Sequence, residues 1–275
     1  MTARKRSSKQ RPASADGSHL VEIPIESWEH YLSEVSTQPL REWAFRGQKD
    51  ASWHLWSTVS RELRNRGVAN RYWTDQEYNI IRIFQRKAPH LLEKMPEVGD
   101  TPQWIALMQH HGAPTRLLDF TWSPYVAAFF ALESSVCDAA VWAINTPKLG
   151  TYAYGPYFQQ SLRPPDPQEV LKQVGLGGLN DVAFGEPYFK NRRVVAQSGT
   201  FAWPSDITRP LDAILSKKKG VIAKLVLPAS IRRPALREIH RMNITYATLF
   251  PDLDGLARSM AFELERHWKF DPTEP

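Results

Sequence analysis

Residues 109–131 hold a dense set of side chains that can do chemistry. The segment reads QHHGAPTRLLDFTWSPYVAAFFA, and its polar members are Gln109, His110, His111, Thr115, Arg116, Asp119, Thr121 and Ser123. Imidazoles exchange protons near neutral pH, and a guanidinium bonds two oxygens of a phosphate or carboxylate at once. Apolar residues surround this set, and charges in apolar surroundings need partners. The pattern therefore predicts a binding or catalytic site.

Two further segments have a similar density of polar groups. In residues 43–63, WAFRGQKDASWHLWSTVSREL, Arg46 follows two aromatic residues and precedes Gly47. A short strand that ends in a turn at this glycine lets the guanidinium project toward a phosphate or carboxylate ligand. Residues 191–204, NRRVVAQSGTFAWP, centre on the Gln-Ser-Gly triplet that begins at Gln197. The first of these segments is a candidate anion site, and the second adds neutral polar groups.

Residues that typically end or begin helices indicate the elements that position the first segment. Gly112 is expected to end a helix, because glycine adopts the left-handed conformation at low cost. Residues 115–120 are expected to form a short strand. Ser123 and Pro124 then predict the start of a helix, with serine as N-cap and proline at the first helical position. The following residues, 125–132, are apolar on all sides, which predicts a buried helix.

Periodicity predicts the remaining elements. Helices are expected over residues 25–35, 53–63 (in whole or in part), 74–92, 101–111, 234–242 and 253–268, and strands over residues 43–48, 139–144, 193–203 and 221–227. Thr74 and Glu77 are expected to form a capping box. Residues 147–190, rich in proline, glycine and aromatic residues, are expected to form a long insertion or lid. Strands and helices alternate irregularly, which favours an α+β domain over a doubly wound sheet.

Composition excludes several classes of protein. Hydrophobic residues make up 42% of the 275 residues, as is usual for a globular protein. Cys137 is the single cysteine, so an internal disulfide and a cysteine-rich zinc site are excluded and a reducing cytoplasm is expected. No apolar run approaches the roughly 20 residues that span a bilayer. The N-terminal residues lack the apolar region of a secretory signal, so a membrane location is not expected.

The positive charge is concentrated at the N-terminus. Of the net charge of +6, residues 1–18 carry +4, from five basic residues and one acidic residue, which leaves +2 for residues 19–275. This composition predicts a disordered basic tail. Such a tail either contacts RNA, DNA or an acidic partner, or serves solubility alone.

Several motifs, taken in their order along the chain, resemble those of a known protein family. FRG at 45–47, QHHGAPTRLLDFTWSP at 109–124 with AAFFAL after it, and AQSGTF at 196–201 resemble the FRG domain family, which is named for its Phe-Arg-Gly motif. LFPDLDGLA at 249–257 is similar to that family's C-terminal signature. The resemblance covers roughly residues 25–265, so residues 19–275 are expected to form one FRG domain after the tail.

The family in turn resembles ADP-ribosyltransferases in layout. That resemblance implies a split, mixed or antiparallel sheet flanked by helices, with NAD bound as a substrate between the two halves. It implies a first-strand Arg or His that grips the dinucleotide, a hydroxyl residue after a second strand, and a Glu or Gln on a later strand. Arg46, then Thr121 or Ser123, then Gln197 match these places. The implied protein is an NAD-dependent toxin or phage-defence effector, with an antitoxin or chaperone among its expected partners.

Gln197 departs from what such a transferase usually needs. A carboxylate stabilises the cationic ribosyl group in the transition state, and a neutral amide cannot. The candidates for the missing acid are Asp119, Glu186 and Asp252. Asp119 also suits a pairing with Arg116 or a backbone amide, and Asp252 also suits the capping of a helix.

These arguments define an explicit candidate site. The expected catalytic residues are Arg46, His111, Gln197 and Asp119. The expected NAD-binding residues are Arg46, Gln48, His110, Arg116, Thr121 and Ser123. One of the two adjacent histidines is expected to act as a base or hydrogen-bond donor. No metal site is expected, because neighbouring side chains on a helix point about 100° apart.

Other interpretations of the same residues stay open. Arg46 also suits a structural role that ties its strand to a loop carboxylate, and Arg116 with Asp119 suits an internal salt bridge. The acceptor of ADP-ribose is nucleic acid or, alternatively, protein. The alternative function is a non-catalytic sensor module that binds a nucleotide or a nucleic acid. A nuclease is disfavoured, because no cluster of acids suited to Mg²⁺ stands out.

Overall fold

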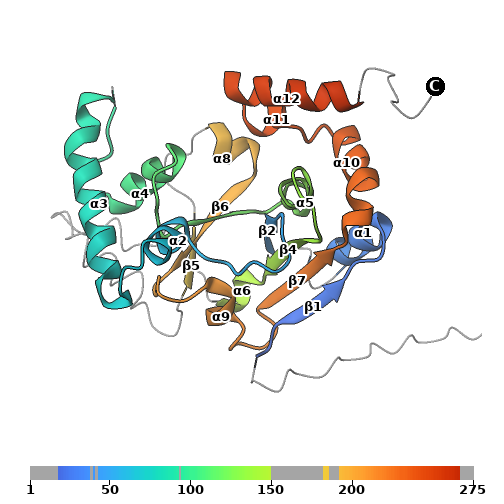
Figure 1. Ribbon diagram of the computed structural model, residues 1–275, viewed down its shortest axis with the longest axis horizontal. Helices are drawn as coiled ribbons and strands as arrows, with labels where there is room; N and C mark the ends of the chain where they lie inside the picture. Colours follow the sequence, from blue (N-terminus) through green and yellow to red (C-terminus); the bar gives the residue numbers. More distant parts are fainter. Residues whose placement is uncertain are drawn as a thin grey trace, which may run out of the picture.

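A computed structural model of the protein describes residues 18–37, 40, 43–92, 94–149, 182–185 and 192–266 (Figure 1). The expected basic tail lies outside these residues except for Ser18. Most of the expected lid at 147–190 and the candidate acid Glu186 also lie outside them. The Phe-Arg-Gly motif and residues 109–131 lie wholly within the described ranges.

The described strands form one seven-stranded mixed sheet in the order β1-β7-β4-β2-β3-β6-β5. Their bounds are β1 Val21–Pro24, β2 Ala44–Gln48, β3 Leu118–Thr121, β4 Ala139–Ile144, β5 Val182–Gly185, β6 Gly199–Pro204 and β7 Ile222–Leu227. Strand β1 runs parallel to β7, and the other described pairs are antiparallel. The prediction of a mixed sheet is confirmed.

The pairing between β2 and β3 is much shorter than the pairing between the neighbouring strands β2 and β4. These two strands share one register pair, Phe45 with Thr121, whereas β2 and β4 share five. The prediction of a split sheet is therefore corrected in one respect, because both halves belong to a single sheet that is joined at this pair. On either side of the joint, backbone groups of β2 and β3 must find partners other than each other.

Helices lie on both faces of the sheet (Figure 1). Their bounds are α1 Trp28–Ser36, α2 Thr58–Asn65, α3 Trp73–Lys87, α4 Thr101–His110, α5 Pro124–Leu132, α6 Thr146–Leu149, α8 Arg192–Ala196, α9 Leu211–Leu215, α10 Arg232–Arg241, α11 Tyr246–Leu249 and α12 Leu253–Arg266, with 3-10 turns η2 Asn70–Tyr72, η3 Ala88–His90 and η5 Ala229–Ile231. Helices α1, α5 and α10 share a core with Phe45 and Val141. Helix α9 packs on the other face, with Ala44 and Trp142. Because side chains alternate along a strand, Arg46 lies on the face opposite α5.

Gly47 allows the backbone of β2 to pack directly against the backbone of α5, with no side chain between them. A Cβ on Gly47 would lie 2.0 Å from the carbonyl oxygen of Ala127 and 2.6 Å from the amide nitrogen of Ala131. The expected turn at this glycine does not form, since Gly47 lies inside β2. The glycine of the Phe-Arg-Gly motif is therefore required for packing, and the buried Phe45 beside it faces the same helix core.

The helices on either side of β3 follow the sequence prediction. Ser123 is the N-cap of α5 and accepts a hydrogen bond from the amide of Val126 at 3.3 Å, with Pro124 in the first turn. Gly112 follows α4 with a φ of 78°, in the left-handed region that favours glycine. Across the described ranges, the helices are too short or too polar to cross a membrane.

Three further sequence predictions differ from the structure. Residues 193–203 were expected as one strand, but they form the end of helix α8 and then β6. Ser198, between the two elements, has a φ of 47°, which is incompatible with a continuous extended strand. The capping box of Thr74 and Glu77 does not form, because the Glu77 side chain is buried in another contact. Residues 182–185, expected within an irregular lid, form the edge strand β5.

Candidate functional site

A cleft of about 1090 Å³ is lined by β2, β3 and β6 and by parts of α2, α4, α5 and α8. It includes the joint of the sheet, since Phe45 and Thr121 both line it. Ligand pockets commonly enclose roughly 300–1,000 Å³, so the cleft has room for a dinucleotide. Of the predicted site residues, those that line it are Arg46, Gln48, His110, Asp119, Thr121 and Gln197, and those outside the lining are His111, Arg116 and Ser123.

Arg46 connects the two diverging strands through its side chain. Its Nη1 donates to the backbone carbonyl of Asp119 at 2.6 Å and lies 4.0 Å from the carboxylate of the same residue. Its Nε is buried and has no hydrogen-bond partner within the described ranges. Burial lowers the pKa of this guanidinium, Asp119 opposes that effect and Arg61 adds to it. Arg46 therefore combines a structural contact with unused donor capacity.

Asp119 supplies the acidic group of the cleft lining in the described part of the chain. Both of its carboxylate oxygens accept from Nε2 of Gln109, at 3.1 and 3.0 Å. Gln109 in turn accepts from the hydroxyl of Thr115 at 2.5 Å. The carboxylate is 59% exposed and so remains accessible to a ligand. The expected pairing of Asp119 with Arg116 does not form, and Arg46 is the cation beside it.

The cleft walls combine positive charge with aromatic rings. The basic side chains of the lining, apart from histidines, are Arg46, Lys49, Arg61, Arg64 and Arg193. Lys49 lies over Trp53 at 5.7 Å from the ring centroid, and Arg64 lies over Trp56 at 5.5 Å. Cations beside rings suit an anionic ligand that also carries flat groups. The sequence alone does not single out Lys49, Arg61 and Arg64, because only the fold turns them toward Arg46.

His54 and Asp212 form a hydrogen-bonded pair that sequence reasoning missed. Nδ1 of His54 lies 2.7 Å from Oδ2 of Asp212, whose Oδ1 accepts from the amide of Leu55 at 2.7 Å. The Asp212 side chain is 8% exposed, whereas that of His54 is 65% exposed and lines the cleft. The two residues are 158 positions apart, so no local motif could have revealed the pair.

Several predicted ligand-binding side chains hold the cleft walls together. Thr121 donates to the carbonyl of Gln197 at 2.6 Å and accepts from the amide of Ser123 at 3.0 Å. Gln48 accepts from the indole of Trp142 at 2.7 Å. Gln197 donates its side-chain amide to the last carbonyl of α11 at 3.0 Å. These polar groups therefore fix the positions of β2, β3 and α8 around the cleft.

The two adjacent histidines have different surroundings. Their rings lie 4.9 Å apart, and His110 lines the cleft whereas His111 does not. Burial lowers the pKa of His110, with His111 and Arg193 adding to this shift and Asp252 opposing it. Asp252 forms a 2.6 Å ion pair with Arg193 and accepts from the amide of Gly255 in the first turn of α12. The expected capping role of Asp252 is confirmed, so this candidate acid already has partners.

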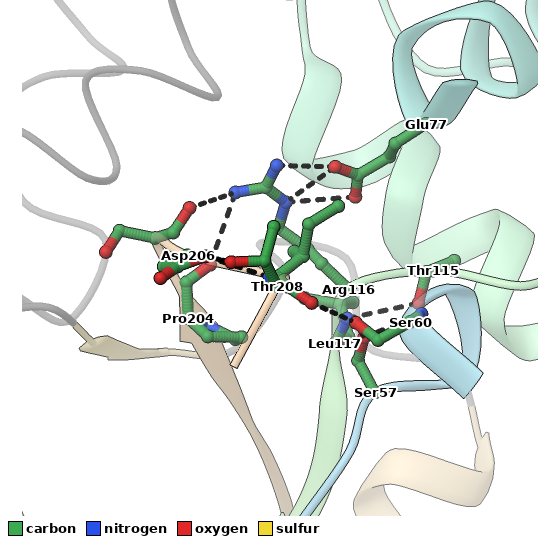
Figure 2. Close-up of polar contacts among 11 residues, drawn as sticks. Ser57, Ser60, Glu77, Thr115, Arg116, Leu117, Pro204, Asp206 and Thr208 are labelled. Carbon is green, nitrogen blue, oxygen red and sulfur yellow. Dashed lines mark hydrogen bonds and ion pairs between the residues drawn. The ribbon is translucent and has the colours of Figure 1, made fainter. Parts of the chain in front are cut away.

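Arg116 lies in a buried ion pair with Glu77 and not in the cleft lining (Figure 2). Its Nε lies 2.9 and 3.1 Å from the two Glu77 oxygens, and both side chains are 1% exposed. Its Nη1 also donates to the carbonyl of Pro204 at 3.2 Å. We therefore remove Arg116 from the candidate NAD-binding set, because a charge buried this deeply needs an internal partner and has one.

Fold and site together describe a mixed α/β protein with a basic, aromatic-walled cleft at the joint of its sheet. Residues 41–139 match the family model of the FRG domain. The resemblance to the FRG domain that the motifs predicted is thereby shown for this range, which contains β2, β3 and the Phe-Arg-Gly motif. Strand β6, α8 and residues 249–257 lie beyond the matched range. No curated protein and no solved structure matches the chain.

Proposed function

We propose that the cleft binds NAD and that the protein transfers ADP-ribose from it to a macromolecule. One observation carries the proposal. Arg46 lines a basic cleft with 21% of its side chain exposed, and within the described ranges Nη1 is its one nitrogen with a hydrogen-bond partner. The two phosphates of a dinucleotide would supply acceptor oxygens there, and charge-assisted hydrogen bonds to phosphate are among the strongest in proteins.

The rest of the cleft supports a dinucleotide over a small anion. A volume of about 1090 Å³ exceeds what a lone phosphate needs. The rings of Trp53 and Trp56, each beside a cation, suit stacking with an adenine or nicotinamide ring. The single joint between β2 and β3 also supports the ADP-ribosyltransferase-like layout, in which the ligand lies where two halves of a sheet separate.

Asp119 provides the carboxylate that Gln197 cannot provide. In the proposed reaction the bond between ribose C1′ and the nicotinamide nitrogen breaks, nicotinamide leaves with the bonding pair, and an acceptor atom bonds to C1′. A carboxylate close to C1′ stabilises the positive charge on the ribosyl group. The paired hydrogen bonds from Gln109 hold the Asp119 carboxylate in one orientation, which reduces the reorganisation needed during the reaction.

The proposed acceptor is nucleic acid, with protein as the alternative. Basic walls attract a polyanion before any sequence-specific contact forms. We place the activity in a toxin or phage-defence effector, since consumption of NAD or modification of nucleic acid stops growth. Overproduction of the wild-type protein in a bacterial host should then arrest growth, and Arg46→Ala should relieve the arrest.

Incubation of the full chain with NAD labelled in its adenylate part, together with DNA, RNA and cell lysate, tests the proposal. We expect free nicotinamide and label on one polymer, both reduced up to about 100-fold by Arg46→Ala, since one charge-assisted contact contributes up to about 3 kcal/mol. Arg66→Ala is the matched control, because Arg66 is an exposed arginine outside the cleft lining. Wild-type protein that releases no nicotinamide would overturn the transferase.

The alternative is a sensor module that binds a nucleotide without turnover. The internal hydrogen bonds of Gln48, Thr121 and Gln197 favour it, because side chains already satisfied by the fold make a rigid recognition surface. This alternative predicts saturable binding of NAD or an oligonucleotide that weakens in Arg46→Ala, with no release of nicotinamide.

A further inference from the structure

We propose that His54 is the general base of the cleft and that Asp212 is its positioning residue. This inference rests on the proposed transfer reaction, and it assigns to His54 the proton-accepting role that the sequence suggested for His110 or His111. The geometry that carries it is the contact of 2.7 Å between Nδ1 of His54 and Oδ2 of Asp212.

The pair is arranged so that one ring nitrogen is held and the other is free. Asp212 is buried, and its second oxygen accepts from the amide of Leu55 at 2.7 Å, which fixes the carboxylate. An ionised carboxylate accepts hydrogen bonds and donates none, so the proton of neutral His54 resides on Nδ1. Nε2 then carries the lone pair, and it has no hydrogen-bond partner among the described residues.

The position of His54 is tied to the strand that carries Arg46. The carbonyl of His54 accepts from Nε2 of Gln48 at 3.2 Å, and Gln48 is two residues from Arg46 on β2. The loop that carries the proposed base is therefore hydrogen-bonded to the strand that carries the proposed phosphate anchor. His110, the other histidine of the lining, has no carboxylate hydrogen-bonded to its ring within the described ranges, so it lacks this orientation.

The step that follows conserves atoms and charge. A hydroxyl or amine of the acceptor bonds to C1′ of the ribose as the C1′–nicotinamide bond breaks, and nicotinamide leaves as a neutral molecule with the electron pair of that bond. The acceptor's proton passes to Nε2 of His54, and the resulting imidazolium is stabilised by Asp212. A positioned general base contributes roughly 10²–10⁴-fold to rate.

Four variants of the full chain test this assignment. His54→Ala removes the base from an exposed position, so loss of the fold is not expected. Asp212→Asn places an amide NH₂ against Nδ1, which moves the ring proton to Nε2 and blocks proton acceptance. Arg46→Ala serves as the binding-deficient reference. His90→Gln is the matched control, because His90 is an exposed histidine on η3 outside the lining.

We expect kcat for nicotinamide release with acceptor to fall about 100-fold or more in His54→Ala and in Asp212→Asn. NAD affinity by titration calorimetry should stay within about twofold, and His90→Gln should match the wild type. Free imidazole at tens of millimolar should restore part of the rate of His54→Ala and none of the rate of Asp212→Asn. A purely structural role for the pair would not produce this difference.

The outcomes separate the two proposals. If the wild type releases no nicotinamide, the transferase and the base assignment both fail. If the wild type turns over and His54→Ala is equally fast, the transferase stands and the role of His54 is refuted. Loss of NAD binding in His54→Ala, or a lost rate that imidazole does not restore, would also refute it.

Discussion

Arg46 on β2 donates from Nη1 to the carbonyl of Asp119 on β3 at 2.6 Å, next to the one register pair that joins these strands. A side chain here satisfies a backbone group that strand pairing leaves open. The same guanidinium lines the cleft with its Nε unused in the described part of the chain. Arg46 is therefore both a side-chain link between the two halves of the sheet and the proposed phosphate anchor.

Arg46→Lys separates charge from geometry. Lysine keeps the positive charge but lacks the planar fork that bonds a carbonyl and phosphate oxygens together. We expect NAD to bind about 10- to 100-fold more weakly, which corresponds to about 1.4–2.8 kcal/mol. Titration calorimetry of Arg46→Lys beside Arg66→Lys measures this effect. An unchanged dissociation constant would mean that the guanidinium geometry is not used.

Gly47→Ala tests the packing role of the motif's glycine. The new Cβ would meet two backbone atoms of α5, at 2.0 and 2.6 Å, and backbone cannot move aside as a flexible side chain can. We expect the free energy of unfolding in urea to fall by about 3 kcal/mol. Gly67→Ala is the matched control, since Gly67 has a φ of +67° and open space around it. That variant should lose only about 1 kcal/mol, from backbone strain.

Local patterns along the chain were sufficient for the elements that carry the site. Ser123 as N-cap and Gly112 after α4 were predictable because caps depend on a few neighbouring residues. The buried helix α5 followed from an all-apolar run, and the short strand expected at residues 43–48 corresponds to β2. The failure at 193–203 has a local cause too, because the left-handed Ser198 leaves no signal in hydrophobic periodicity.

Local sequence patterns cannot predict contacts between residues that are far apart in the sequence. His54 and Asp212 are 158 positions apart, and Glu77 and Arg116 are 39 apart. Sequence patterns therefore place Arg116 in the cleft and Glu77 in a capping box, because each pattern takes in neighbouring residues alone. The sequence shows that both segments are polar, but only the fold decides which polar groups face the cleft and which face each other.

Glu77→Gln tests the buried pair of Glu77 and Arg116 (Figure 2). The amide nearly keeps the shape of the carboxylate but leaves the guanidinium charge buried without a counterion. Breaking one partner of a buried pair costs about 3–5 kcal/mol, and we expect a loss of that size in urea unfolding. Glu62→Gln is the control, since Glu62 pairs with Arg66 at the exposed C-terminal end of α2, and this variant should lose less than about 1 kcal/mol.

Removal of both buried charges provides the complementary measurement. The double variant Glu77→Leu with Arg116→Leu leaves no unpaired charge, although the carbonyls of Pro204 and Ser205 each lose a donor. We expect it to be more stable than Glu77→Gln alone, because hydrophobic replacement of a whole buried pair is often nearly neutral. A double variant less stable than the single one would contradict this account.

His110 predicts how stability depends on pH. Burial lowers its pKa in the folded protein below the value of about 6.5 for an unfolded chain. The unfolded state therefore takes up this proton at a higher pH than the folded state does. The contribution of His110 to stability is fully present above pH 6.5 or so and is lost as pH falls through the lowered pKa.

His110→Gln removes this titration and leaves a neutral polar side chain in the cleft wall. The melting temperature of the wild type minus that of the variant should therefore decrease steadily between about pH 7.5 and 5, since only the wild type loses the contribution. Differential scanning calorimetry at several pH values measures it. Arg193 lowers the pKa of His110 further, whereas Asp252 raises it. In an Asp252→Asn background the pKa of His110 should therefore be lower still, and the pH-dependent loss of stability due to His110 should be larger. A pH-independent difference between wild type and His110→Gln would show that the imidazole is not desolvated by the cleft.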